Sequence, residues 1–228
     1  MMIERKESLT MKSESNITVK NDENLNTFDT ERLEQQMNFI REIDKEKQIF
    51  RQNYLTDGLR KENDAEHAWH MAIMTFLLSD YANEEIDVLK TIKMLLIHDI
   101  VEIDAGDTYA YDDVAKETQH ERETLAANRI FGLLPKDQGE QLLALWEEFE
   151  EGTSKEARFA RVMDNLQPML LNDASNGKSW EEHGVVLSKI LKRNERTPLG
   201  SNILWTYAKE QILEKNIEMG HIGKDTEF

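Results

Sequence analysis

Four residues that can bind a metal ion lie within, or at the ends of, segments whose apolar residues recur at helical spacing. His98 and Asp99 form a doublet that closes the apolar run MLLI, His67 lies upstream in NDAEHAWH, and Asp164 lies downstream in RVMDNLQPML. Together they supply two imidazoles and two carboxylates, a set that suits a divalent ion. An adjacent His-Asp pair at the border of an apolar run has little packing purpose. We therefore predict one metal site with His67, His98, Asp99 and Asp164 as its ligands.

The available residue types limit which metal ions the site can bind. The chain has no cysteine, which excludes thiolate ligands, disulfides and a cysteine nucleophile. Nitrogen and oxygen ligands suit Mn, Co, Fe, Ni or Zn better than Mg, which prefers oxygen alone. We expect one divalent ion and leave its identity open among these metals. A zinc protease is rejected because EHAWH runs in the wrong order and its histidines are three residues apart.

A third carboxylate follows the doublet at helical spacing. Glu102 lies four residues after His98 and three after Asp99, so a helix would place all three on one face. A carboxylate beside a metal can accept a proton from water or donate one to a leaving group. We predict that Glu102 is catalytic. In contrast, His70, His183 and His221 are interpreted as core residues, because a lone histidine on an apolar helix face usually packs there.

The length and the net charge limit which classes of protein this chain can belong to. The chain has 228 residues and a formal charge of -17, with 28 Lys and Arg against 45 Asp and Glu. This length favours one domain. The acidic balance argues against a nucleic-acid polymer as partner, although a small anionic substrate can still bind beside a metal. There is no apolar run long enough for a membrane span or a signal peptide, so we expect no membrane partner and a cytoplasmic location.

The apolar periodicity predicts an all-α fold, a compact helical bundle. Residues 1–27 are polar and are expected to form a disordered tail, and residues 28–228 a single domain. A loop is expected over 53–63, and Asp64 is the expected cap of the second helix. Pro168 is expected to kink its helix or release the Asp164 carbonyl. Helices are expected over 30–50, 65–81, 85–98 (with a continuation to 103 left open), 114–134, 136–150, 154–172, 181–193 and 202–219.

With these residues in order, the chain resembles the HD-domain metal-dependent phosphohydrolases, and more closely their 5'-deoxynucleotidase-like subgroup. The resemblance covers about residues 30–220 and rests on ENDAEH at 62–67, HDIVEIDAGD at 98–107 and RVMDNLQ at 161–167. It implies an all-helical fold and a divalent ion held by the four ligands named above. It also implies proton transfer by Glu102 at the attacking water, and a role for Asp107 in holding the nucleotide or assisting the chemistry.

The resemblance further implies how a substrate phosphate is bound. Arg51, in IFRQNYLTDGLR, matches the arginine that holds this phosphate, and Arg60 and Lys61 are additional candidates. The deoxynucleotidases follow that arginine with a tryptophan that crowds the sugar 2' position, whereas this chain has Gln52. The preference for deoxyribose or ribose therefore stays open. Such enzymes are commonly dimers, so a homodimer is a further hypothesis.

Our hypothesis from the sequence is the metal-dependent hydrolysis of (deoxy)nucleoside 5'-monophosphates to nucleoside and phosphate. One alternative keeps the fold and changes the substrate to a nucleoside di- or triphosphate or another small phosphate ester. A second is a two-metal HD phosphodiesterase or oxygenase. Such sites generally use extra histidines between the doublet and the last aspartate, whereas here only His120 lies between the doublet and Asp164, which favours one metal. A third is a non-catalytic HD domain that senses a nucleotide or a protein partner.

Overall fold

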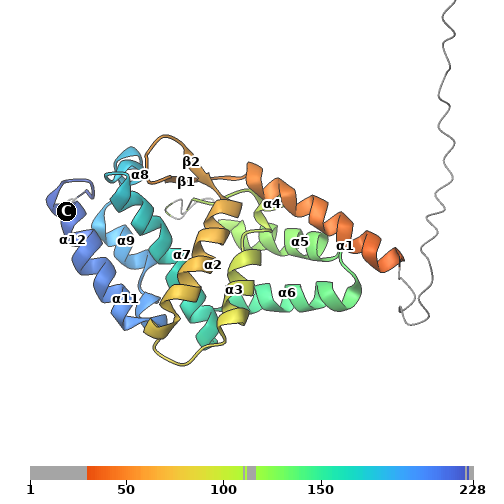
Figure 1. Cartoon of the computed structure of the whole chain (residues 1–228). Coiled ribbons are helices and arrows are strands. Elements are labelled where there is room, and N and C mark those ends of the chain that lie inside the picture. Colours follow the sequence, from red (N-terminus) through yellow and green to blue (C-terminus); the bar gives the residue numbers. More distant parts are fainter. Residues whose placement is uncertain (1–29, 110, 112–116, 224, 226–228) are drawn as a thin grey trace, which may run out of the picture. The chain divides into compact units, whose positions relative to one another are not determined.

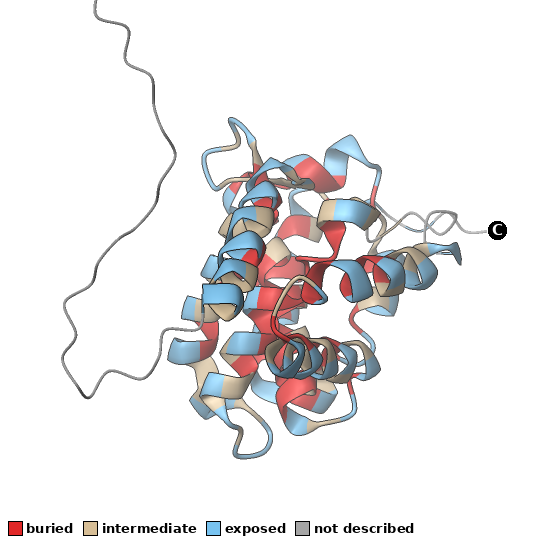
Figure 2. Ribbon diagram, turned by 90° about the vertical axis from the view of Figure 1, so that its right-hand side faces the viewer, coloured by how far each residue is buried: buried red, intermediate tan, exposed pale blue. Residues whose placement is uncertain are grey.

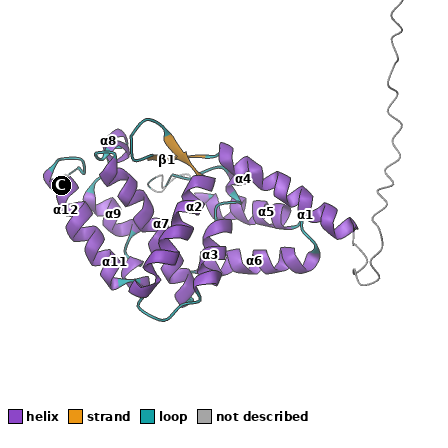
Figure 3. Cartoon of the chain, in the orientation of Figure 1, coloured by secondary structure: helices purple, strands orange, loops and turns teal. Residues whose placement is uncertain are grey.

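A computed structural model describes residues 30–109, 111, 117–223 and 225 (Figure 1). The chain divides into two units, and the second, Glu31–Phe228, contains nearly all of the described residues. The predicted polar tail over 1–27 lies outside the described residues. Helices dominate the second unit, which confirms the predicted all-α class (Figure 3).

The first part of the unit is a helix followed by a small hairpin. Helix α1 (Thr30–Ile43) leads through a 3-10 turn (Asp44–Gln48) into strand β1 (Phe50–Tyr54), which pairs antiparallel with β2 (Lys61–Asn63). The predictions of a helix over 30–50 and a loop over 53–63 are therefore wrong in part. The apolar period that predicted the helix stops at Ile43, since Phe50 is more than half exposed. Such short, polar strands carry no clear alternation, so their sequence does not reveal them.

The second helix begins with a reciprocal cap. In α2 (Asp64–Leu78), the Asn63 side chain accepts a hydrogen bond from the Glu66 backbone N–H, and the Glu66 carboxylate accepts one from the Asn63 N–H. This capping box satisfies two helix-terminal donors. The prediction that Asp64 is the cap is wrong by one residue. Asp64 is instead the first helical residue, and its side chain is fully buried.

The third helix ends at the doublet instead of passing through it. Asp87 caps α3 (Val88–Ile97) by accepting from the Lys90 N–H, and α4 (Glu102–Ala105) follows after a tight turn. The expected start at 85 and the continuation to 103 are therefore not observed. Gly106 ends α4 with φ of 75°, a left-handed conformation that glycine adopts without strain. The break sets His98 and Asp99 in the turn, where they need not follow a helical surface.

The rest of the unit consists of helices of very different lengths. The expected helix over 181–193 is two helices separated by a turn at Gly184, and the expected helix over 202–219 contains a π-helical segment, Ala208–Leu213. The elements are η2 (Ser79–Tyr81), α5 (Gln119–Phe131), α6 (Lys136–Glu151), α7 (Lys155–Ala174), α8 (Lys178–Glu182), α9 (Leu187–Arg193), α10 (Thr197–Gly200), α11 (Asn202–Tyr207), η4 (Ala208–Leu213) and α12 (Glu214–Glu218).

Helix α7 is the central element of the larger of two apolar cores. It packs against α2, α3, α6 and α10, and its Phe159, Val162 and Met163 are fully buried. Figure 2 shows the buried residues gathered on the inward faces of the helices. The helix continues on both sides of Pro168. The second core joins α1, α5 and α6 around Phe131. Among the described residues, no helix has the length and apolar character needed to cross a membrane.

Candidate metal centre and active site

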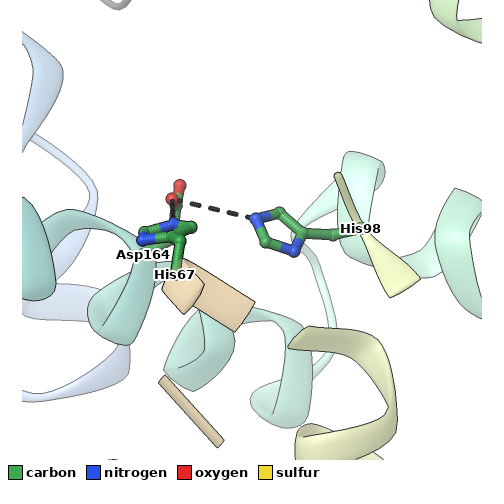
Figure 4. Close-up of side chains that lie close together, drawn as sticks. All are labelled: His67, His98 and Asp164. Atoms are coloured by element: carbon green, nitrogen blue, oxygen red, sulfur yellow. Dashed lines mark hydrogen bonds and ion pairs between the residues drawn. The ribbon is translucent and has the colours of Figure 1, made fainter. Parts of the chain in front are cut away.

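The four predicted ligands come together from three parts of the fold. His67 lies in the first turn of α2, His98 lies in the turn after α3, and Asp164 lies midway along α7 (Figure 4). Asp99 follows His98 in the same turn. The Asp164 Oδ1 atom is 3.3 Å from Nε2 of His67 and 3.9 Å from Nε2 of His98. The Asp99 carboxylate lies 3.0 Å from His98 Nε2 and 3.9 Å from His67 Nε2. All four side chains are buried.

Both imidazoles turn the same nitrogen towards this cluster. The Nδ1 atom of His67 is 2.9 Å from Oε1 of Gln167, and that of His98 is 3.0 Å from the Leu95 carbonyl oxygen. Because both partners are acceptors, each Nδ1 carries a proton, and Nε2 is the nitrogen that is left to bind a metal. The Phe149 ring packs edge-on against His98, with 4.8 Å between the ring centroids. The rings are thus fixed in the orientation that metal-binding histidines require.

This arrangement fits a divalent ion. His67, His98 and Asp164 each offer a ligand atom, and these atoms lie within 4.8 Å of one another. Among the described residues, the buried Nε2 atom of His98 lies 3.0 Å from the Asp99 carboxylate but makes no hydrogen bond of good geometry to it or to any other group. A buried polar atom without a partner is costly, and a metal ion would satisfy it. We infer that the site is built for a cation, with Asp99 close enough to take part.

A cavity of about 350 Å³ opens beside the cluster. Its wall includes the ligands His98, Asp99 and Asp164, and also the predicted functional residues Arg51, Glu102 and Asp107. The structure therefore brings the predicted catalytic and phosphate-binding residues to the metal cluster, apart from Arg60. The other lining residues include Gln52, Asn53, Tyr109, Tyr111, His120, Glu123, Arg161, Trp180 and Arg193.

Glu102 is buried and lines this cavity. Burial, together with the negative charges of Asp99 and Asp64, raises the pKa of Glu102 well above its ordinary value of 4.5. Burial also raises the pKa of Asp107, and the charge of Asp99 adds to this effect. A carboxyl group with a raised pKa binds a proton more strongly than an ordinary one and can exchange it in a reaction. The arrangement therefore suits Glu102 to proton transfer.

Arg51 reaches the cluster from the hairpin. Its Nη1 atom donates to Asp99 Oδ2 at 2.6 Å and lies 3.4 Å from Asp64 Oδ1, while Nη2 is 4.0 Å from Asp164 Oδ1. Burial opposes the charge of this guanidinium, but the surrounding carboxylates raise its pKa well above its ordinary value. Arg51 is thus a fixed positive charge within the site.

Arg60 lies elsewhere. It is exposed near the end of the hairpin loop, where its guanidinium donates to both carboxylate oxygens of Glu66 at 2.8 and 2.5 Å. It does not line the cavity. The structure therefore separates the two arginines that the sequence had grouped as phosphate-binding candidates.

Three charged residues near the site were missed by sequence reasoning. Asp64 is fully buried beside Arg51, and burial together with the charge of Asp99 raises its pKa to about 7. Glu46 is buried close by, and burial raises its pKa to about 7 as well. Arg193 lies 3.3 Å from Asp164 Oδ2. The capping box could have shown that Asp64 is not the cap, whereas nothing in the sequence marks Arg193.

The interpretation of the lone histidines as core residues is wrong for one of them. His183 is exposed and lies beside the Tyr109 ring, with 4.5 Å between the ring centroids. His70 and His221 are partly buried, and each has a polar partner, Gln167 and Glu181 respectively. His70 therefore belongs to the polar network behind His67.

Comparison with known proteins decides the family. The sequence model of the HD domain matches residues 43–204, a range that contains all four predicted ligands. The chain belongs to the HD domain family. The HD domain therefore includes α2, α3 and α7, the elements that carry the histidines and aspartates of the candidate metal centre.

Relatives of this HD domain include proteins named as nucleotidases. The chain is 31% identical to the 5'-deoxynucleotidase HDDC2 of Mus musculus over 135 residues, which is 59% of this chain and 66% of the relative. It is 30% identical to the protein of the same name from Homo sapiens over 135 residues, which is 59% of this chain and 65% of the relative. The chain thus spans slightly less than two thirds of the length of these relatives.

A solved structure resembles this chain, and the match covers almost the whole length of the solved protein. It is the crystal structure of a predicted metal-dependent phosphohydrolase from Magnetospirillum magnetotacticum MS-1, with a TM-score of 0.81 and 47% sequence identity. The match covers 84% of this chain and 96% of that one.

Proposed function

We propose that the protein hydrolyses (deoxy)nucleoside 5'-monophosphates to nucleoside and inorganic phosphate. The observation that carries this proposal is that one cavity joins the metal-binding cluster, the fixed positive charge of Arg51 and the buried carboxyl of Glu102. These are a cation site, a phosphate-binding charge and a proton-transfer group, the parts that phosphate ester hydrolysis requires. The names of the relatives support the same substrate class.

The residues divide the chemistry among them. His67, His98 and Asp164, with Asp99, would hold one divalent ion, which would supply Lewis-acid polarisation of the phosphate and a lowered pKa of water. Arg51 would contact a phosphate oxygen and offset its charge. Glu102 would take up the proton that the attacking water loses, because burial and the neighbouring carboxylates raise the affinity of its carboxylate for a proton.

The charges of the cavity favour one phosphate over three. Among the described residues, its wall carries the carboxyl groups of Asp99, Glu102, Asp107, Glu123, Glu150 and Asp164 but only three arginines. One of these, Arg161, already donates to the Phe149 and Glu150 carbonyl oxygens. A triphosphate would bring more negative charge than the remaining arginines and one ion offset. Tyr109, Tyr111 and Trp180 supply apolar surface for a nucleoside.

The substrate class is tested by phosphate release from a panel of compounds with and without Mn²⁺ or Co²⁺. The panel contains ribo- and deoxyribonucleoside 5'-monophosphates, the matching di- and triphosphates, and glycerol phosphate as a phosphate ester without a base. We expect metal-dependent turnover that is at least tenfold faster, in kcat/KM, for the 5'-monophosphates than for the other compounds. Equal rates on glycerol phosphate, or faster hydrolysis of triphosphates, would contradict the proposal.

We further propose that two copies of the chain pair through the outer face of α2. This face carries Trp69, Ile73, Phe76 and Leu77, which are each between 44% and 68% exposed, opposite the buried face of the same helix. From His70 to Ser79 the helix carries no acidic, lysine or arginine side chain. A helix that is apolar on both faces is usually covered on both. Sedimentation should show a dimer that Phe76→Glu converts to a monomer, and an already monomeric wild type would contradict this proposal.

Two other features stay predictions from the sequence. The first is the number of ions, one per chain, which elemental analysis of the purified protein would measure. The second is the cytoplasmic location.

A further inference from the structure

A buried polar network contacts Nδ1 of His67, the ring nitrogen opposite the one that faces Asp164. Gln167 is fully buried in α7, one turn after Asp164. Its Oε1 atom lies 2.9 Å from His67 Nδ1, and its Nε2 atom donates to Glu62 Oε1 at 2.6 Å. Nε2 is also 3.1 Å from His70 Nδ1. Glu62 itself is buried in β2 and only 2% exposed.

The network fixes which way the Gln167 amide faces. A carboxylate oxygen only accepts hydrogen bonds, so the group that faces Glu62 must be the NH₂ of the amide. His70 Nδ1 can accept the second hydrogen of that NH₂. The amide oxygen is thereby left for His67, and rotation of the amide would bring two oxygens together at Glu62. The orientation is therefore decided by Glu62, a residue outside the metal cluster.

The orientation of the amide in turn decides the tautomer of His67. An oxygen at Nδ1 requires the proton on that nitrogen, and the lone pair then lies on Nε2, 3.3 Å from Asp164 Oδ1. With the opposite amide orientation, an NH₂ group would face Nδ1 and favour the proton on Nε2, where it would block a metal. We propose that Gln167 and Glu62 are positioning residues that hold His67 in its metal-binding tautomer.

This inference gives the hairpin a second purpose. Strand β1 carries Arg51, and β2 carries Glu62. One small sheet therefore positions both the arginine that contacts the cluster and the carboxylate that orients Gln167. The inference rests on the proposed metal site but not on the proposed substrate. Metal affinity measured without any nucleotide therefore tests it independently of turnover.

The first experiment compares Mn²⁺ affinity by calorimetry in the metal-free full-length wild type and in Gln167→Leu. We expect Gln167→Leu to weaken binding by about 10 to 100-fold, the usual effect of removing a group that orients a metal-binding histidine. The matched control is Asn216→Leu, which removes another buried amide that donates to Asp173 and to the Ile212 carbonyl oxygen, far along the chain in α12. We expect the control to bind Mn²⁺ within twofold of the wild type.

A second set of variants keeps side-chain size and does not depend on Gln167→Leu folding. Glu62→Gln removes the group that orients the amide, and we expect it to weaken Mn²⁺ binding at least fivefold. The double variant Glu62→Gln with Gln167→Glu exchanges the amide and the carboxylate. It restores an acceptor to His67 Nδ1 and a donor between the two side chains, so we expect it to recover affinity to within threefold of the wild type. Unchanged affinity in Glu62→Gln, or no recovery in the double variant, would overturn the inference.

Discussion

Arg51 stands among three carboxylates, and this position shapes what the residue can do. Its contacts with Asp99, Asp64 and Asp164 keep the guanidinium in one place before any substrate arrives. A charge that is already oriented costs little reorganisation when a phosphate binds. Arginine also presents donors in a planar fork that lysine cannot reproduce. The site therefore depends on the shape of this side chain as well as on its charge.

We expect Arg51→Lys to lower kcat/KM for a nucleoside 5'-monophosphate by about 10 to 100-fold, because loss of oriented charge contacts costs a few kcal/mol. Arg60→Lys should stay within threefold of the wild type, since Arg60 pairs with Glu66 outside the cavity. Steady-state phosphate release with Mn²⁺ measures both. An equal loss of kcat/KM in the two variants would contradict the conclusion that Arg51 contacts the phosphate and Arg60 does not.

Residue types pointed to the candidate ligands, which the structure brings together, but not to their surroundings. The His98-Asp99 doublet and Asp164 stood out because imidazoles and carboxylates on apolar helical faces are unusual. Asp64, in contrast, looked like an ordinary helix cap, and only the three-dimensional structure shows it fully buried beside Arg51. Gln167 was equally hidden, since a glutamine in a helix carries no signal of its partners.

At the scale of the elements, α2 carries His67 in its first turn and so depends on how that helix begins. The cap at Asn63 fixes the end of β2 and the start of α2 together. Helix periods were predictable because they extend over many residues. The hairpin was not, because strands of five and three residues hold too few side chains to show a period. The end of α3 was left open because its apolar pattern continues through Ile100 and Val101 into a second core.

We expect Asn63→Ala to lower the free energy of unfolding by about 1 kcal/mol, the usual cost of losing an N-cap side chain. The reason is the loss of the hydrogen bond to the Glu66 N–H, at 3.0 Å. Urea unfolding of the metal-free protein followed by circular dichroism measures this change, with the m value expected to stay the same. A change of less than 0.3 kcal/mol, well below the range for such caps, would contradict the capping box.

At the scale of the whole molecule, the acidic composition affects stability through pH. The protein carries a formal charge of -17, and part of that charge belongs to carboxyl groups buried around the cavity. Such groups are stable in the folded protein only while they hold a proton or face a cation. A bound divalent ion should therefore stabilise the fold as well as supply chemistry.

Glu123 provides a test of this pH dependence in the metal-free protein. Burial raises its pKa to about 7 from an ordinary 4.5, against the hydrogen bond from Gln119, and the charges of Glu150 and Asp99 add to the increase. Between these two pH values the folded state keeps the proton that the unfolded state loses. The contribution of Glu123 to stability therefore falls as pH rises from about 4.5 to about 7 and then stays constant.

We expect Glu123→Gln, which cannot ionise, to gain stability relative to the wild type as pH rises through that window. Urea unfolding of both proteins at pH 5 and pH 7.5 measures the difference, and the other titrating groups cancel in the comparison. A difference that is the same at both pH values, or smaller at pH 7.5, would show that Glu123 ionises normally in the folded state.

The most direct test of the proposed active site compares the wild type with Glu102→Gln, both loaded with Mn²⁺. Bound Mn²⁺ is counted by elemental analysis, and phosphate release from a deoxynucleoside 5'-monophosphate is measured under the same conditions. We predict equal metal content and a kcat that is at least 100-fold lower in Glu102→Gln, within the usual range for the loss of a proton-transfer group. A variant that keeps its metal and more than a third of the wild-type kcat would contradict the proposed site.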